Sequence, residues 1–276
     1  MDISAGNLLR PAPINDGSFT VEQLRRRRPL SMRRGLKRVT FTGADDKTPI
    51  HEIVELAKDF PFVEVGILVS ATNEGKPRYP SREWQRRLRD AALDADIDVA
   101  MHICGLYSQE FFHAEHSPWE RIGPVKHCAR RIQINGAPSH ASMRISQWIR
   151  ELLRRERVKE FIFQIPNGQE AMRQAFNEGL PAFALFDESG GNGKVPMERR
   201  APVGGFTISC AGKRFVGYAG GIGLNNLHRE LDKVERACED DFWIDMEGRL
   251  RQEVTDTFDL DIVRAIANEC AKRVII

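Results

Sequence analysis

The chain has 276 residues, of which 41% are hydrophobic and 29% charged, a composition typical of a globular protein with a full core. The formal net charge of +2 does not make the whole molecule a polyanion binder, and no apolar run approaches the roughly 18–20 residues that a membrane-spanning helix needs. The five cysteines form no CxxC pair, which argues against a disulfide framework and a zinc knuckle. The N-terminus lacks the pattern of a secretory signal, so we expect a cytoplasmic protein that does not enter a membrane.

A basic segment precedes the first expected strand. Eight Lys or Arg residues fall between Arg25 and Arg38, and residues 1–37 form an Arg-rich N-terminal extension. This pattern fits a solvated arm or a helix face at a subunit contact, which allows a homo-oligomer. Binding to a nucleic acid or an anionic surface is the less favoured alternative. No aromatic residue lies among these arginines, so base stacking is not indicated.

Eight short apolar runs rich in β-forming residues follow the extension. They lie at residues 38–43, 62–70, 97–104, 131–136, 160–166, 182–188, 215–222 and 242–248. Helical patterns occupy most gaps, at residues 48–60, 81–93, 142–156, 168–179, 224–239 and 259–273. The first of these predicts Thr48 as the N-cap, with Pro49 in the first turn. The gap between Glu188 and Phe215 is rich in Gly and Pro, and a full helix is not expected there.

Strands that alternate with helices pair in parallel, because each crossover needs a covering element. Eight such units in about 240 residues predict a (β/α)8 barrel, at residues 38–276. A doubly wound open sheet is the alternative. It would normally carry a glycine fingerprint after its first strand, and FTGADD is not one.

The expected strands end in polar residues or glycine. In a (β/α)8 barrel the carboxyl ends of the strands carry the chemistry. Buried polar groups without partners cost about 1–3 kcal/mol each, so a ring of them predicts a polar cavity. The residues at these ends are Thr42, Ser70, His102, Asn135, Gln164, Asp187, Gly220, Gly221 and Glu247.

Several inward positions have two interpretations. His102 fits a core histidine or a catalytic one. Glu64 lies early in its strand, on the same face as Gly66, and fits an ion pair that closes the barrel or a functional base. Asn135 and Gln164 fit packing partners or substrate ligands.

Two glycine-rich stretches favour anion binding. Asp187 ends an apolar strand and is followed by three glycines in four positions, which favours a functional carboxylate. The Gly220–Gly221 pair before the helical pattern fits a tight turn. It also fits a set of free N–H groups that would hold an anion.

Five motifs within residues 39–270 resemble those of phosphoribosylanthranilate isomerase, a (β/α)8 enzyme of tryptophan biosynthesis. They are Asp187 followed by GGNG, YAGGIGLNNL with Gly220 and Gly221, Asp245 in FWIDMEG, Arg78 in KPRYPS, and Asn135 in QING. The resemblance implies that Asp187 is a general acid and that Arg78 pairs with a substrate carboxylate. It also implies that the backbone of four glycines holds a phosphate: Gly191, Gly193, Gly220 and Gly221. Asp245 and Glu247 are expected to contact the substrate as well.

The sequence departs from this family at the first strand. TFTG places Thr42 where the family has its catalytic cysteine. A threonine hydroxyl cannot act as a base near neutral pH without help. The alternative bases are Asp45, Glu64, His102 and Cys104.

The motifs together predict an isomerase that acts on a small phosphorylated or carboxylated substrate by acid–base chemistry, without a cofactor. A metal-dependent epimerase or lyase is one alternative, with a divalent metal at His102, Asp187 and Glu247, although no short ligand spacing supports it. The other alternative is a non-catalytic barrel that binds a ligand and uses its basic arm to engage a partner or RNA.

Overall fold

The computed structural model describes residues 34–113, 118–136, 145–187, 194–202 and 215–275. Most of the basic extension lies outside these residues, as do Gly191 and Gly193.

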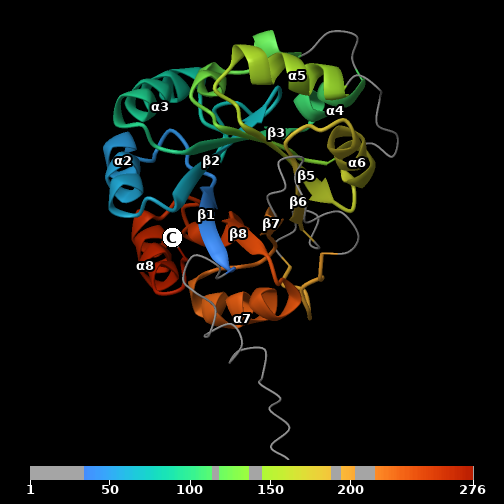
Figure 1. Cartoon of the computed structure of the whole chain (residues 1–276). Helices are drawn as coiled ribbons and strands as arrows, with labels where there is room; N and C mark the ends of the chain where they lie inside the picture. Colours follow the sequence, from blue (N-terminus) through green and yellow to red (C-terminus); the bar gives the residue numbers. More distant parts are fainter. Residues whose placement is uncertain (1–33, 114–117, 137–144, 188–193, 203–214, 276) are drawn as a thin grey trace, which may run out of the picture. The chain divides into compact units, whose positions relative to one another are not determined.

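Eight parallel strands close into a barrel in chain order, as Figure 1 shows along the barrel axis. They are β1 (Leu36–Thr42), β2 (Val63–Ser70), β3 (Val99–Cys104), β4 (Arg131–Ile134), β5 (Glu160–Ile165), β6 (Ala182–Phe186), β7 (Phe215–Tyr218) and β8 (Asp241–Met246). The barrel closes between β8 and β1, where Thr40 pairs with Asp245. All eight expected strands are confirmed, and the open-sheet alternative is wrong.

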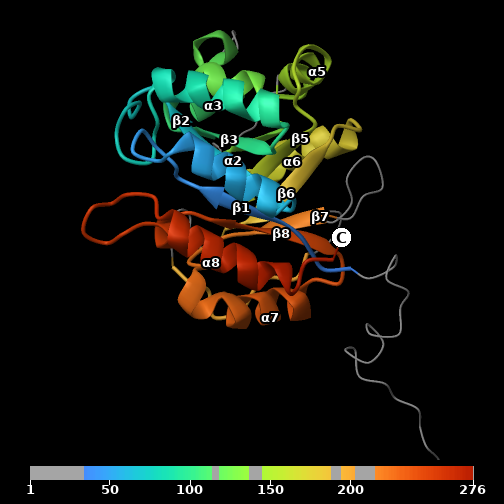
Figure 2. The same cartoon turned by 90° about the vertical axis from the view of Figure 1, so that its left-hand side faces the viewer.

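Helices surround this barrel (Figures 1 and 2). They are α2 (Ile50–Asp59), α3 (Arg82–Ala95), α4 (Leu106–His113), α5 (Ile145–Arg155), α6 (Gln169–Asn177), α7 (Leu227–Ala237) and α8 (Leu260–Ala271), with the 3-10 helices η2 (Pro118–Arg121), η3 (Pro124–His127), η4 (Leu224–Asn226) and η5 (Gly248–Leu250). The six expected helices are confirmed, while α4, η2, η3 and η5 were not expected. The α4 helix is short; its buried face holds Tyr107, Ser108, Phe111 and Phe112, while Leu106 is exposed, so the apolar stripe in its sequence is incomplete. None of the helices in the described part of the chain is long and apolar enough to cross a membrane.

The expected cap of α2 is wrong. The N-cap is Pro49, and no side chain caps this helix. Thr48 is buried, and its Oγ1 accepts a hydrogen bond from the backbone N–H of Asp45 at 3.1 Å. Because the hydroxyl stabilises the turn before the helix, it does not reach the first helical N–H groups.

The strands bury side chains on both faces. Outward residues such as Val39, Phe41 and Val65 pack with the helices in the main core. The interior between β5 and β8 is filled by a separate apolar cluster of Ile162, Phe183, Leu185, Phe215, Ala219 and Trp243. Gly217 makes room for this cluster, because a Cβ there would lie 2.3 Å from the Trp243 ring. The opposite side of the interior, along β1 to β4, is polar, and the candidate site lies at its carboxyl end.

Candidate functional site

Asp245 is a buried carboxyl group near the carboxyl end of β8. Thr42 Oγ1 donates a hydrogen bond to Asp245 Oδ1 at 2.8 Å, while His102 Nδ1 lies 3.9 Å from Oδ2. Burial, aided by the carboxylates of Glu64 and Asp187, raises the pKa of Asp245 to about 7, against the hydrogen bonds from Thr42 and Gln133. A carboxyl group with this pKa can donate or accept a proton at neutral pH. The sequence predicted Asp245 only as a substrate contact.

His102 lies deeper in the barrel interior and is 1% exposed. Its burial lowers its pKa to about 4, so the imidazole is neutral at physiological pH. Gln133 Nε2 lies 3.3 Å from His102 Nδ1, and His102 Nε2 has no hydrogen-bond partner within the described residues. Because its surface is almost fully covered, His102 is not open to direct contact with a molecule at the barrel mouth.

Gly66 creates the space in which Thr42 and His102 meet. A Cβ at this inward position of β2 would lie 2.1 Å from Thr42 Oγ1 and 3.1 Å from His102 Nε2. A glycine inside a strand often marks such a close approach, which is the signal that could have placed Gly66 in the site.

Glu64 lies nearer the amino end of the barrel and is fully buried. It accepts hydrogen bonds from Arg131 and Thr40, both at 2.8 Å, and from Arg38 at 3.3 Å. Burial alone would raise the pKa of Glu64, but Arg131 and Arg38 outweigh it and lower the pKa. This arrangement fits the interpretation of Glu64 as an ion pair that closes the barrel.

Neighbouring polar residues are engaged with one another. Asn135 Nδ2 donates to Cys104 Sγ at 3.3 Å, and Gln164 Oε1 accepts from the Gly136 N–H at 3.0 Å. Burial raises the pKa of the Cys104 thiol to about 12, so it stays protonated at neutral pH. A protonated thiol does not serve as the missing base.

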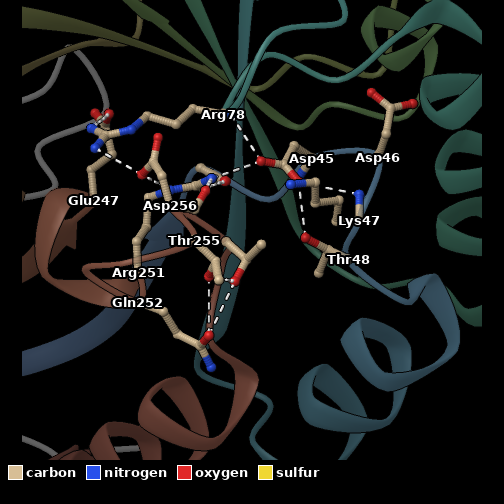
Figure 3. Close-up of polar contacts among 12 residues, drawn as sticks. Asp45, Asp46, Lys47, Thr48, Arg78, Glu247, Arg251, Gln252, Thr255 and Asp256 are labelled. Carbon is tan, nitrogen blue, oxygen red and sulfur yellow. Dashed lines mark hydrogen bonds and ion pairs between the residues drawn. The ribbon is translucent and has the colours of Figure 1, made fainter.

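Arg78 lies on the loop between β2 and α3 and has a left-handed backbone, with φ of 73°. Its N–H donates to Asp45 Oδ2 at 2.9 Å, which holds this strained conformation in place. Its guanidinium donates to Glu247 at 3.1 Å and to Asp256 at 3.3 Å, as Figure 3 shows. Burial and the Asp245 carboxylate raise the pKa of Glu247, although Arg78 opposes them. The guanidinium of Arg78 therefore lies at the barrel mouth, where it is paired with the carboxylates of Glu247 and Asp256.

Arg251, which the sequence did not single out, joins the loops around this arginine (Figure 3). Its buried guanidinium contacts Asp45 and Asp256, both at 2.7 Å, and the carbonyl oxygen of Gly43. Asp45 is thereby shared between two arginines and is not a free base.

The glycine turn after β7 has positive φ at two successive residues, 91° at Gly220 and 64° at Gly221. L-residues with a Cβ rarely adopt such angles. Arg199 donates to the Gly220 carbonyl at 3.0 Å, and Asn226 Nδ2 donates to the Gly221 carbonyl at 2.9 Å. The η4 helix follows this turn and leads directly into α7, so the glycine pair precedes the helical segment that begins at Leu224.

Asp187 directly follows β6, and it is buried. Its carboxylate acts on the pKa of Asp245, which places both acids in one electrostatic environment. No group of three or more His, Cys, Asp or Glu side chains in the described ranges is arranged to hold a metal ion. His102, Asp187 and Glu247 thus do not form the metal site that the alternative required.

Comparison with known proteins identifies no family: no family model and no curated protein matches this sequence. Solved structures with a similar fold include a truncated 3-deoxy-D-arabino-heptulosonate 7-phosphate synthase from Thermotoga maritima, with 12% identity, 86% of each chain covered and a TM-score of 0.47. A sialic acid synthetase from Leptospira borgpetersenii serovar Hardjo-bovis covers 86% of this chain and 83% of its own, with 11% identity and a TM-score of 0.46. A D-psicose 3-epimerase from Clostridium cellulolyticum H10 has 12% identity, covers 84% of this chain and 91% of its own, and has a TM-score of 0.40.

Similarities of this size carry no information on the activity of this chain. The barrel assignment follows from the pairing of its own strands, and the resemblance to phosphoribosylanthranilate isomerase gains no support at the family level.

Proposed function

We propose that this barrel is an acid–base enzyme in which Asp245 transfers a proton to or from the substrate. The observation that carries the proposal is the position of Asp245, a buried carboxyl group near the mouth of the barrel whose pKa is raised to about 7. Carboxyl groups with strongly perturbed pKa values cluster at functional sites, because proton transfer is most effective when the pKa lies near the working pH.

Asp187 supplies a second carboxyl group in the same environment. Isomerisation needs one group that donates a proton and another that accepts one, and two neighbouring carboxyl groups can divide these roles. This pair supports an isomerase, with Asp245 in the place of the base that Thr42 cannot provide. Asp187 keeps the role of general acid that the sequence suggested.

The proposed substrate is a small phosphorylated or carboxylated, sugar-like molecule. Arg78 holds its guanidinium at the mouth of the barrel beside Glu247 and Asp256, so an anion there would bind its remaining N–H groups, and the turn at Gly220 and Gly221 offers backbone N–H groups. If the phosphate or carboxylate groups of the substrate bind to Arg78 and to the Gly220–Gly221 turn, the hydroxyl and carbonyl groups between them would lie near Asp245.

The test is solvent exchange with the full-length protein. Aldose phosphates, ketose phosphates and phosphoribosylanthranilate are incubated in D2O, and deuterium incorporation at the carbon next to the carbonyl or imine carbon is followed by NMR. We expect exchange with at least one compound, and a loss of about 10²–10⁴-fold in rate for Asp245→Asn. Asp90→Asn on the exposed face of α3 is the matched control and should keep the full rate.

Full exchange by Asp245→Asn would contradict the proposal. Calorimetry with inorganic phosphate tests the anion site separately, because Gly221→Val should abolish binding while the fold is kept. Phosphate binding without exchange of any compound would favour the non-catalytic barrel.

A further inference from the structure

The side-chain amide of Gln133 lies among three hydrogen-bond acceptors. Gln133 is buried, on β4, and its Nε2 lies 2.9 Å from Asn135 Oδ1 and 3.3 Å from His102 Nδ1. The same side chain hydrogen-bonds Asp245 and lowers the pKa of that carboxyl group, as a donor does. An amide nitrogen carries only two hydrogens. Gln133 Nε2 can therefore donate to only two of the three acceptors, Asn135 Oδ1, His102 Nδ1 and the Asp245 carboxyl group, at one time.

His102 is the acceptor that fixes the geometry. Gln133 Nε2 lies 3.3 Å from His102 Nδ1, and an amide nitrogen can only donate, so a proton on Nδ1 would place one donor against another. The neutral ring therefore carries its hydrogen on Nε2 and accepts at Nδ1. Burial and the charge of Arg131 also oppose an imidazolium here, against the attraction of Glu64 and Glu247.

The carboxyl group of Asp245 is where a proton is held most easily. Glu64 on β2, Asp187 after β6 and Glu247 after β8 place negative charge around it, and the cation of Arg131 on β4 is paired with Glu64. Asp245 Oδ1 already accepts from Thr42, while Oδ2 faces His102 Nδ1 at 3.9 Å, which is longer than a hydrogen bond. An ion pair between carboxylate and imidazolium is thus not formed.

We propose that Asp245 and His102 form a dyad that holds one proton, on the carboxyl group, and that Gln133 is the positioning residue that keeps the imidazole in its Nε2–H form. The inference rests on the proposed function, in which Asp245 transfers that proton. As a carboxylate, Asp245 takes a proton from a substrate carbon, and the electron pair of that C–H bond stays on the substrate. The Asp245 O–H then returns the proton to the substrate or to water, while the N–H of Gln133 that faces His102 Nδ1 stays in place.

NMR of the full-length protein tests the position of the proton. The protein is labelled with 15N in histidine and 13C in the aspartate carboxyl groups, and it is titrated from pH 5 to 8. Spectra of His102→Gln and Asp245→Asn assign the two signals by difference. We expect His102 as the neutral Nε2–H tautomer throughout and an Asp245 carboxyl that titrates near pH 7. An imidazolium or an Nδ1–H tautomer at pH 6 would overturn the dyad.

Gln133→Met tests the positioning role. Loss of the amide should shift the titration of Asp245 upward, because a donor to its carboxylate is gone, and His102 should populate both tautomers. The matched control is Gln85→Met, which removes another buried glutamine, on α3, whose Nε2 donates to the Pro80 carbonyl at 2.8 Å. Its Asp245 and His102 signals should match those of the wild type. Unchanged signals in Gln133→Met would overturn the role of Gln133.

The two proposals fail in different ways. The spectra need no substrate, so a lack of deuterium exchange would count against the enzyme and leave the dyad standing. A His102 imidazolium would overturn the dyad even if Asp245→Asn abolished exchange. If Gln133→Met does not fold, the wild-type spectra still decide where the proton lies.

Discussion

The two ends of the polar barrel interior bury carboxyl groups with opposite consequences. Near the amino end, Glu64 lies between Arg131 and Arg38, and its pKa is lowered despite full burial. Near the mouth, Asp245 receives neutral donors from Thr42 and Gln133 but no close cation, and its pKa rises to about 7. The interior thus holds one carboxylate as a fixed charge and one as a carboxyl group that gains and loses a proton.

Charge balance, and not burial, separates the two ends. Removing a carboxylate from water costs several kcal/mol unless partners compensate for it. Arg131 donates to Glu64 at 2.8 Å and pairs with Glu160 at 2.9 Å, so the amino end compensates for its charges. At the mouth, no cation compensates for the burial of the Asp245 carboxylate, so the protonated form is favoured, as expected for a group that exchanges protons.

The largest expected effect comes from breaking the amino-end pairs. Arg131→Met should lower the free energy of unfolding by about 3–5 kcal/mol, because Glu64 and Glu160 are left without their central partner. Urea denaturation monitored by circular dichroism measures it. Arg130→Met is the matched control: its side chain is 30% exposed, so we expect a loss of at most about 1 kcal/mol. Equal losses in the two variants would contradict the assignment of a stabilising ion cluster to this end.

The pH dependence of stability should differ between the two carboxyl groups. Asp245 has a pKa of about 7 in the folded protein against an ordinary value of 3.8, so its stabilising contribution is complete below pH 3.8 and is lost as the pH rises through 7. The pKa of Glu64 is lowered from 4.5, so its contribution is present above pH 4.5 and is lost as the pH falls through the folded value.

Asp245→Asn should therefore gain stability relative to the wild type between pH 5 and 8, by up to several kcal/mol. Glu64→Gln should lose stability across the same range. Urea unfolding at pH 5, 6.5 and 8 measures both changes, and Asp90→Asn should follow the wild type. If Asp245→Asn kept the wild-type pH dependence, the raised pKa of Asp245 would be ruled out.

Gly66→Ala tests the packing around the dyad. Its Cβ would lie 2.1 Å from Thr42 Oγ1, so we expect a loss of about 1–3 kcal/mol and displacement of Thr42 from Asp245. Thr42→Ala in the same chain should recover much of that loss in a double-mutant cycle of unfolding free energies. Gly217→Ala overpacks the apolar side against Trp243 and should show no such recovery with Thr42→Ala. A cycle without coupling between positions 42 and 66 would show that the two residues do not share this space.

The smallest effect on stability is expected at the rim. The Arg78 side chain is 34% exposed and its partner Glu247 39%, so Arg78→Met should change the unfolding free energy by less than about 1 kcal/mol. The same variant should weaken the binding of inorganic phosphate, as measured by calorimetry, if Arg78 takes part in anion binding. A large loss of stability would instead assign Arg78 to the framework of the mouth loops.

Local patterns were sufficient for the strands and for most helices. The strands bury both faces and appear as short apolar runs, and the six expected helices carry one apolar face each. The cap of α2 could not be read in this way, because Thr48 bonds to Asp45 in a turn whose shape depends on the surrounding loops. The α4 helix was missed because it is only eight residues long, with a serine on its buried face and a leucine on its exposed face.

The positions of the polar strand ends were also predictable, because parallel strands in a barrel all end at one mouth. The partner of each charge was not. Arg251 lies 206 positions from Asp45 along the chain, and nothing near either residue indicates their contact. The sequence therefore indicated Thr42, Asp187 and Glu247 as polar groups at the strand ends. Only the tertiary structure decided that Glu64 is paired while Asp245 is not, because the pKa of a buried carboxyl group depends on the charges that other strands bring within a few ångströms.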